Sequence, residues 1–510
     1  MVTQQKSSYL TSLATIVTIA ALAVAIGFYY PIINAYIKVG TSLSTTATNT
    51  CAQLRTELEF VIVLPSDAQY SALRTKSWSQ AAWKNPTCIA IPTSSSDVQK
   101  VVRVLVANHV PFAIRSGGHS PNPLDANIDT GVLIATDKLD QVSYDAATGL
   151  ASLGPGATWD AVYTALDKHD VTVVGGRVMK VGVGGLILGG GLSYLSDLYG
   201  LVCDNVISYE VVLADGSIVE ATQENHPDLF WALKGGANNF GIVTGFKLKT
   251  FPIQQIWGGM LVFTIDQMPD VLQAYYEYQA TPNKDLHANT VLNLAPSNGS
   301  VILTLVYLKP VERPDAYKSF YHLTPAFEKT GLMTLHELMG SFPATDLPRW
   351  AWYMVAFKPD SELFAQISNV IATAPETAAI SALQAGTLVG TAQPINQNVV
   401  LAGRERGGNP LGLQPVNQTW FSVNIAWWNA EDDSAAIAAL ESLHAKIVEL
   451  ARRASVELDY IFMNDANAKQ SVIASYGEDN VRRLRAVQQT YDPDLIFQNL
   501  VPGGQKLPPA

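Results

Sequence analysis

The residue types best suited to chemistry stand together directly after an apolar, strand-like run that ends at Ile114. They are Arg115, Ser116, Gly117, Gly118, His119 and Ser120. The paired glycines let the backbone approach a bound group closely, and N–H groups exposed at such a turn attract anionic oxygens. The Arg115 guanidinium would add a fixed positive charge, and the His119 imidazole would place a nucleophile at the edge of this anion site. A surface turn with an incidental histidine explains the same residues about equally well.

A second glycine-rich stretch, residues 174–191, favours the ligand-binding interpretation. It is not a dinucleotide-binding fingerprint, because the third glycine of a G-x-G-x-x-G motif that starts at Gly182 would fall on Ile187. No lysine follows in the way that a phosphate-binding P-loop requires. Two glycine-rich loops with strand-like flanks instead fit a large, flat, phosphate-containing ligand.

Further motifs follow in order along the chain. They are G-P-G-A-T-W at 154–159, V-G-V-G-G at 181–185, G-G-G at 189–191, Y-G-L-V-C-D-N-V at 199–206, D-L-F-W-A-L-K-G-G at 228–236, F-G-I-V-T at 240–244 and Y-D-P-D-L-I-F-Q at 491–498. Together with R-S-G-G-H-S, these motifs resemble the vanillyl-alcohol-oxidase (p-cresol methylhydroxylase) superfamily of flavoproteins, in particular the fungal berberine-bridge-enzyme-like FAD-linked oxidoreductases. The resemblance extends from Cys51 to Lys506.

The resemblance implies an FAD cofactor bonded through its 8α-methyl carbon to His119. The other residues that would contact it are Arg115, Ser116, Gly117, Gly118, Ser120, Val181, Val183, Gly184, Gly185 and Ile242. Bicovalent members carry a cysteine that bonds flavin C6 where this chain has Val178, so a single link through His119 is expected. A small residue at the position of Val181 resembles members that use O2. No metal ligand is assigned.

By the same resemblance, the fold class is α+β, with a PCMH-type FAD-binding domain in two parts, residues 45–253 and 457–507. A substrate-binding domain with an antiparallel sheet and helices, residues 254–456, is inserted between them. Hydrophobic spacing predicts helices at 94–108, 159–167, 361–373, 433–454 and 478–490, the fourth capped by Asp432 or Asp433. Apolar or alternating runs predict strands at 110–114, 133–135, 142–144, 206–213, 218–220, 260–264, 290–294, 301–307 and 421–428.

A flavin enzyme also needs a group that takes a proton from the substrate while the isoalloxazine accepts the electron pair. Tyr460 is the first candidate for this catalytic base and Asp465 is the second. A core phenol and a helix N-cap are the structural alternatives for these two side chains. The family's usual tyrosine/asparagine pattern is replaced here by Phe462-Met463-Asn464. The polar residues 404–409 fit a solvated loop slightly better than a pocket wall.

The N-terminal segment, residues 1–40, has no charged side chain between Lys6 and Lys38, and residues 10–30 are long enough to cross a bilayer. A retained signal anchor and a cleaved signal peptide explain it about equally well, and either directs the chain into the secretory pathway. Of three cysteines, Cys51 and Cys88 are expected to pair and to leave Cys203 buried, although other pairings fit the sequence. Triplets at Asn298 and Asn417 predict glycosylation.

The sequence therefore predicts a secretory-pathway, covalently flavinylated oxidoreductase that oxidises a small organic substrate and passes electrons to O2, giving H2O2. The resemblance suggests a step in fungal natural-product biosynthesis. The formal net charge of −11 and the lack of a basic cluster argue against nucleic-acid binding. Two rival functions are a carbohydrate oxidase and a non-catalytic protein on the same scaffold. The intact 115–120 loop argues against the second rival.

Overall fold

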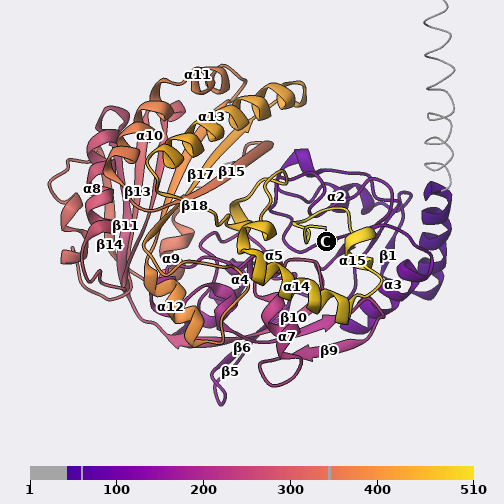
Figure 1. Ribbon diagram of the computed structural model, residues 1–510. Coiled ribbons are helices and arrows are strands. Elements are labelled where there is room, and N and C mark those ends of the chain that lie inside the picture. The colour runs from indigo at the N-terminus through magenta and orange to yellow at the C-terminus, as the bar shows by residue number, and fades with distance from the viewer. Residues whose placement is uncertain (1–42, 59–60, 343–345, 510) are drawn as a thin grey trace, which may run out of the picture.

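The computed structural model describes residues 43–58, 61–342 and 346–509, which form two lobes side by side (Figure 1). One lobe contains two smaller sheets built from the first half of the chain, together with the last helices. The other lobe contains one large sheet and the helices that cover it. The described chain therefore has the α+β architecture expected from the sequence. The N-terminal segment predicted as an anchor or signal lies outside the described residues, and no helix within them is long and apolar enough to cross a membrane.

The first sheet positions the Arg115–Ser120 loop. It has four strands in the order β1-β2-β4-β3, and two of its three pairings, β2 with β4 and β4 with β3, are parallel. Its strands are β1 (Ile62–Val63), β2 (Cys88–Ala90), β3 (Phe112–Arg115) and β4 (Val132–Ala135). Helix α3 (Ser95–Ala107) connects β2 to β3, and the Ser94 hydroxyl caps it by accepting from the Asp97 N–H. This β-α-β unit ends where the glycine loop begins.

The second sheet carries the other glycine-rich stretch. Its strands are β5 (Val142–Asp145), β6 (Leu150–Leu153), β10 (Ile242–Pro252), β8 (Val206–Val212) and β9 (Ile218–Ala221), and β7 (Val171–Val173) pairs with the end of β10. The helices beside it are α4 (Trp159–Asp167), α5 (Val183–Leu188), α6 (Ser196–Tyr199) and α7 (Pro227–Leu233). Near the C-terminus, α14 (Glu478–Tyr491) and α15 (Ile496–Asn499) return to this lobe, where the Phe112 N–H donates to the Leu500 carbonyl over 2.8 Å.

The large sheet has eight strands in the order β14-β11-β13-β12-β16-β17-β15-β18, and all its pairings are antiparallel. Their bounds are β11 (Ile256–Thr264), β12 (Ala288–Ala295), β13 (Ser300–Tyr307), β14 (Phe327–Met333), β15 (Arg349–Phe357), β16 (Thr387–Ile395), β17 (Gln418–Trp427) and β18 (Glu457–Leu458). Helices α8 (Met268–Ala280), α10 (Ser361–Thr373), α11 (Pro375–Ser381) and α13 (Asp433–Arg453) cover the outer face (Figure 1). Helices α9 (Leu335–Gly340) and α12 (Gln397–Glu405) lie towards the first lobe.

Alternation along the strands of the large sheet divides the core into two parts. On β15, Tyr353 and Val355 pack among the outer helices, whereas Met354 and Ala356 pack in the core shared with the first lobe. This division follows from the pleat, which points successive side chains to opposite faces. The inner face of the sheet therefore forms one wall of the space between the lobes.

Most expected elements are present, and the exceptions have physical reasons. Helices α4 and α10 have the predicted bounds, and the predicted strands are found within a few residues. Strands β14, β15 and β16 and helix α8 were not expected. Asp432 makes no side-chain cap on α13, and Asp433 instead pairs with the Arg349 guanidinium and accepts from the Trp427 ring N–H over 2.8 Å. The predicted cap is therefore wrong, because both Asp433 oxygens are engaged with the sheet.

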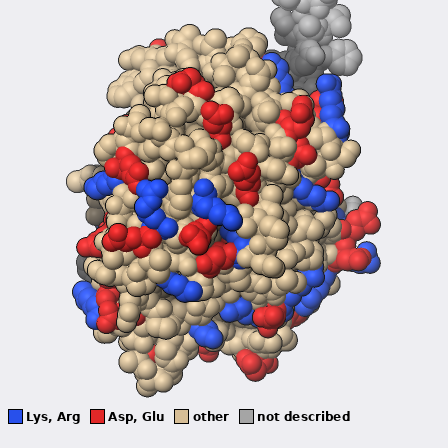
Figure 2. Space-filling view, turned by 90° about the vertical axis from the view of Figure 1, so that its left-hand side faces the viewer, with Lys and Arg blue, Asp and Glu red and all other residues tan. Residues whose placement is uncertain are grey.

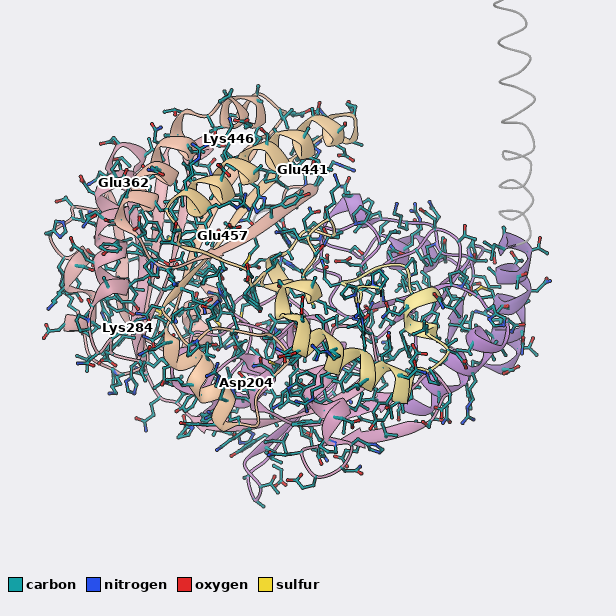
Figure 3. All side chains as sticks on the ribbon, in the orientation of Figure 1. Asp204, Lys284, Glu362, Glu441, Lys446 and Glu457 are labelled. Carbon is teal, nitrogen blue, oxygen red and sulfur yellow. A yellow bond between two sulfur atoms is a disulfide. The ribbon has the colours of Figure 1, made fainter. Side chains whose placement is uncertain are left out.

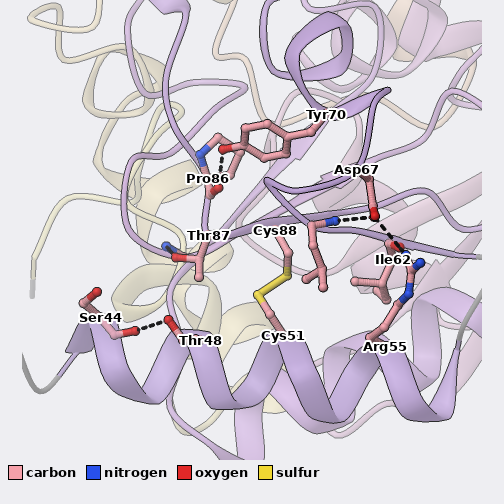
Figure 4. Close-up of a disulfide and its surroundings, with 12 residues drawn as sticks. Ser44, Thr48, Cys51, Arg55, Ile62, Asp67, Tyr70, Pro86, Thr87 and Cys88 are labelled. Carbon is pink, nitrogen blue, oxygen red and sulfur yellow. Dashed lines mark hydrogen bonds and ion pairs between the residues drawn. A yellow bond between two sulfur atoms is a disulfide. The ribbon is translucent and has the colours of Figure 1, made fainter.

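The expected disulfide joins Cys51, on the helix at 43–57, to Cys88 at the start of β2, with 6.0 Å between the Cα atoms (Figure 4). Nearby, the Arg55 guanidinium pairs with Asp67 over 3.0 Å, and the Tyr70 hydroxyl donates to the Pro86 carbonyl over 2.6 Å. These contacts fix the N-terminal helix to the first sheet. Cys203 is free and buried, as expected.

The surface of the second lobe carries charges of both signs. Figure 2 shows Lys and Arg side chains interspersed with Asp and Glu on the face that it presents, with no continuous basic area. Such a surface gives no electrostatic footprint for a phosphate backbone on that face.

A buried ion pair holds the two lobes together. Lys284, which follows α8, reaches Asp197 of α6 over 2.7 Å, and their side chains are only 6% and 1% exposed. Figure 3 labels Lys284 at this place, and it labels Lys446 among the outer helices, where Lys446 pairs with Glu376 over 2.7 Å at 43% exposure. Removing one partner from a buried pair leaves an uncompensated charge, whereas an exposed pair contributes little.

We expect Lys284→Met to lower the free energy of unfolding by about 3–5 kcal/mol, because Asp197 would stay buried and unpaired. Lys446→Met, the matched control, is expected to cost about 0–1 kcal/mol. Urea unfolding followed by tryptophan fluorescence measures both. Equal effects of the two substitutions would contradict the importance of the buried pair.

Candidate active site

The two glycine-rich loops touch each other through their backbones. A Cβ atom on Gly117 would lie 2.5 Å from the Gly182 nitrogen, and one on Gly182 would lie 2.3 Å from the Gly117 nitrogen. Beside them, the Ser116 hydroxyl donates to the Pro155 carbonyl over 2.5 Å and accepts from the Gly184 N–H over 3.2 Å. Only residues without a side chain permit this approach, which joins the end of β3 to the start of α5.

The joined loops form the floor of a cavity of about 390 Å³ between the lobes. Gly185 faces open space, because a Cβ atom there would have no neighbour within 4 Å. The Asn464 side chain braces the far end of the second loop, accepting from the Gly191 N–H over 3.0 Å and donating to the Gly185 carbonyl over 3.3 Å. The cavity therefore has a rigid backbone floor that a flat ligand can approach closely.

The predicted role of Arg115 as a cation facing the ligand is wrong. Ile114 and Ser116 line the cavity, but Arg115, between them on β3, points to the opposite side as the strand alternation requires. Its guanidinium donates to the Leu73 carbonyl over 2.7 Å and lies 3.5 Å from Asp137. Burial lowers the pKa of Arg115 to about 10. Arg115 thus supports the loop from behind.

Ser120 lines the cavity and organises the turn after His119. Its hydroxyl donates to Asp125 over 2.7 Å, and the Asn122 side chain donates to the same oxygen over 2.9 Å. The other Asp125 oxygen accepts from the Gly504 N–H over 3.1 Å. The C-terminal residues therefore close this side of the cavity.

The His119 ring lies against the ring of Trp78, with 4.4 Å between the centroids and 8° between the planes. It also lines the cavity. Burial lowers the pKa of His119 to about 4, so the imidazole is neutral and keeps a free nitrogen lone pair at neutral pH. A neutral imidazole is the nucleophilic form.

The valines of the second loop occupy different environments. Val178 is 54% exposed and lines the cavity, as does Val181. The Val183 side chain is fully buried in the core, and its backbone N–H donates to the Ala157 carbonyl over 2.9 Å. Ile242, at the start of β10, lines the cavity from the second sheet.

A carboxyl group faces the same cavity from the turn at Met463–Asp465, which follows β18. Asp465 lines it and accepts from the Gln393 amide of β16 over 2.8 Å, and the Gln393 carbonyl in turn bonds the Arg177 guanidinium. Burial raises the pKa of Asp465, while the hydrogen bond from Gln393 and the charge of Arg177 oppose that rise. This arrangement gives a carboxyl group that titrates closer to neutrality than an ordinary aspartate.

The structure does not bring Tyr460 to this cavity. Its side chain is only 4% exposed and packs against Trp420 and Tyr476, with ring centroids 5.1 Å and 6.1 Å away. It lines a separate cavity of about 110 Å³, and its hydroxyl has no hydrogen-bond partner within the described residues. Burial raises the pKa of Tyr460 well above its usual value. The core-phenol alternative describes it better than the role of base.

Sequence reasoning missed several side chains near the cavity. Among them, Arg177, Trp352 and Asn424 line it, and Gln393 contacts Asp465 from behind. Arg177 lies inside the glycine-rich stretch, where a cation among glycines is a usable signal. The polar loop at 404–409 does not line this cavity; its Asn409 side chain donates to buried Asp204 over 2.8 Å (labelled in Figure 3).

Comparison with known proteins agrees with this geometry. Residues 86–222 match the family model described as an FAD binding domain. The bifunctional solanapyrone synthase of Alternaria solani is 36% identical over 459 residues, which cover 90% of this chain and 88% of that protein. An FAD-dependent monooxygenase of Arthrobotrys oligospora is 36% identical over 447 residues, with 86% and 85% covered.

Two solved structures share the fold. Glucooligosaccharide oxidase from Acremonium strictum, which carries a 6-S-cysteinyl, 8α-N1-histidyl FAD, superimposes with a TM-score of 0.76 at 19% identity over 91% of this chain and 100% of its own. A berberine bridge enzyme variant superimposes with a TM-score of 0.73 at 18% identity, covering 91% and 99%.

This chain belongs to the family of FAD-dependent oxidoreductases that includes solanapyrone synthase and the fungal FAD-dependent monooxygenases, and it has the fold of berberine bridge enzyme. The described residues fit FAD, because Gly117 and Gly182 let the two loops meet as a backbone floor, and Gly185 on that floor faces open space. In this oxidoreductase, Ser116–Ser120, Val181–Gly185 and Ile242 would hold the cofactor. Bound FAD supplies an acceptor for an electron pair or hydride.

We expect Gly117→Ala to abolish FAD binding, because its Cβ would push the two loops apart. Gly185→Ala should keep the fold and weaken FAD binding, since its Cβ would enter the open floor. Gly340→Ala, at another position with no neighbour within 4 Å of a Cβ, should change neither property. Flavin absorbance per mole of purified protein, together with the thermal midpoint, measures each effect. Full flavin content in the Gly117→Ala protein would contradict the loop contact.

Proposed function

We propose that this flavoprotein is an oxidase that removes two electrons from a small, largely apolar organic substrate and passes them to O2, giving H2O2. FAD is attached to the chain through His119 alone. The observation that carries the proposal is the shared cavity, in which a neutral histidine, two glycine loops and the Asp465 carboxyl meet.

The substrate side of the cavity supports an apolar substrate. The apolar part of its walls includes Trp352, Phe462, Met463 and Val178, and polar side chains such as Asn424 and Asp465 line the rest. An oligosaccharide needs many hydrogen-bond partners, because a buried hydroxyl without one costs free energy. A flat, conjugated or aliphatic molecule with one reacting oxygen or C–H bond fits these walls better. A carbohydrate substrate is therefore the weaker candidate, although a structural neighbour is an oligosaccharide oxidase.

Asp465 would accept the proton that leaves the substrate. As the electron pair passes from the substrate C–H bond to the cofactor, a proton leaves the substrate oxygen or carbon and must be taken up. The carboxylate form of Asp465 can accept it. Gln393 donates to one Asp465 oxygen, and no hydrogen bond within the described part of the chain occupies the other. The Arg177 guanidinium, bonded to Gln393, would help to stabilise negative charge on the substrate oxygen.

A single covalent link is consistent with the residues beside the cofactor floor. His119 is neutral and lines the cavity, so its nitrogen can attack carbon. Val178, which also lines the cavity, has no sulfur with which to form a second bond. The glucooligosaccharide oxidase, by contrast, carries both a cysteinyl and a histidyl link.

We propose that this enzyme catalyses a biosynthetic step for a fungal natural product and that it acts within or beyond the secretory pathway. The biosynthetic role is supported by 36% identity to solanapyrone synthase, whose name describes a synthase for a small molecule. The location is supported by the Cys51–Cys88 disulfide, because disulfides persist mainly in oxidising compartments. Whether residues 1–40 are cleaved or anchor the chain stays a prediction, as do the glycosylation sites.

Asp465→Asn is expected to lower kcat about 10²- to 10⁴-fold, because the amide cannot accept a proton. The flavin content and the attachment should not change. The rate of flavin bleaching by substrate without O2 measures the effect, using the substrate found by screening O2 uptake. Asn424→Ala, which changes another polar residue of the cavity, is the matched control for general damage to the site. A wild-type bleaching rate in Asp465→Asn would exclude Asp465 as the base.

The pH dependence follows from the same carboxyl. Because the base acts when deprotonated and burial raises its pKa, kcat/KM should fall with decreasing pH through a value above that of an ordinary aspartate, about 3.9. Gln393→Leu removes a hydrogen bond that lowers this pKa, so it should move the acid limb to still higher pH. An acid limb that Asp465→Asn leaves in place would belong to another group.

Oxidase chemistry makes a separate prediction about oxygen. One H2O2 should form for each O2 consumed, and no atom of ¹⁸O2 should enter the product. Several relatives carry the name monooxygenase, so mass analysis of the product after turnover under ¹⁸O2 is the decisive measurement. An ¹⁸O atom in the product would replace the oxidase proposal with oxygen insertion.

A further inference from the structure

The residue stacked on His119 comes from a distant part of the sequence. Trp78 lies between α2 (Tyr70–Arg74) and β2, and its ring is nearly parallel to the His119 imidazole. The backbone N–H of Trp78 also donates to the Gly118 carbonyl over 2.9 Å. Both the ring and the backbone of Trp78 therefore contact the loop that carries His119.

Trp78 is held on its other side by the substrate-binding lobe. Its ring stacks on Trp350 of β15 with 4.6 Å between centroids, and Trp352 lies 6.0 Å away. Two hydrogen bonds tie the same segments, from the Trp350 N–H to the Ser79 hydroxyl over 3.2 Å and from the Gln80 N–H to the Pro348 carbonyl over 2.7 Å. A continuous stack thus runs from β15 to His119.

The stack matters because few contacts fix the imidazole plane. Within the described residues, these contacts are a hydrogen bond to the backbone of His119 itself and the stack on Trp78. The terminal torsion of a histidine is broad, so a neighbouring surface must choose its orientation. A flat ring packed face to face on Trp78 has one plane available to it.

Covalent attachment requires that orientation. A C–N bond forms between a His119 nitrogen and the 8α carbon of FAD, and a C–H and an N–H bond break. This exchange releases two protons and one electron pair. The flavin would take up the electron pair, and O2 would then accept that pair together with two protons and form H2O2. The nitrogen lone pair lies in the imidazole plane, so the plane decides whether it points at the carbon.

We propose that Trp78 is a positioning residue for FAD attachment, which orients the His119 ring and is itself braced by Trp350 of the substrate-binding lobe. The inference rests on the proposed covalent link to His119. It makes attachment depend on the docking of the two lobes, since the brace belongs to β15. Aromatic contacts of this kind change an equilibrium by about two- to tenfold.

The test compares variants of the full-length chain produced without flavin and then mixed with FAD. The rate at which flavin becomes resistant to acid precipitation reports attachment, and total bound flavin and the thermal midpoint are measured alongside. Trp78→Ala should slow attachment about two- to tenfold or more while still binding FAD. Trp78→Phe should restore much of the rate, and Trp350→Ala should slow it less than Trp78→Ala. Trp428→Ala, at a tryptophan that is 50% exposed at the end of β17, is the matched control and should attach FAD at the wild-type rate.

Each other outcome overturns the inference. Wild-type attachment in Trp78→Ala would show that the stack does not orient His119. A loss of bound flavin and thermal stability, with an unchanged covalent fraction of the flavin that remains, would show a purely structural role. Release of all flavin from the denatured wild-type protein would remove the covalent link itself and the inference with it. His119→Ala supplies the zero-attachment reference that separates this last outcome from the others.

Discussion

The backbone contact between Gly117 and Gly182 is the constraint on which the rest of the site depends. It requires two glycines that lie 65 positions apart (182 − 117) to meet with no side chain between them. Once they meet, the end of β3 and the start of α5 form one surface. His119 then stands at its edge, and Gly185 lies open beside it. The large sheet closes the space above that surface with Trp352, and the turn at Met463–Asp465 adds the Asp465 carboxyl.

Burial controls the charge state of this site more than ion pairing does. The Arg115 cation is turned away, His119 is neutral because its pKa is lowered, and Asp465 has a raised pKa. A flavin enzyme benefits from this balance, because a neutral imidazole can form a bond to carbon and a carboxyl that titrates nearer neutrality can exchange a proton. Gln393 and Arg177 lower the pKa of the Asp465 carboxyl, although Arg177 contacts Gln393 and not the carboxyl itself.

The sequence predicts well what short-range patterns determine. Helices α4 and α10 follow from apolar spacing and capping residues, and the sequence also predicts the two glycine loops and the Cys51–Cys88 pair. It fails where tertiary contacts decide. Strand β16 contains Gly390 and Pro394 and has no clear alternation, so Gln393 was not seen as a partner of Asp465. The direction of Arg115 depends on strand register, and the burial of Tyr460 depends on Trp420 and Tyr476.

The central claim is that this flavoprotein carries FAD on His119, and one measurement tests it most directly. Trypsin cuts after Arg115 and Lys138, so residues 116–138 form a single peptide in which His119 is the sole histidine. The account predicts that this peptide, from the wild-type chain purified and denatured, carries one FAD-sized mass addition and fluoresces as a flavin. An unmodified peptide from protein that is yellow before denaturation would contradict the account.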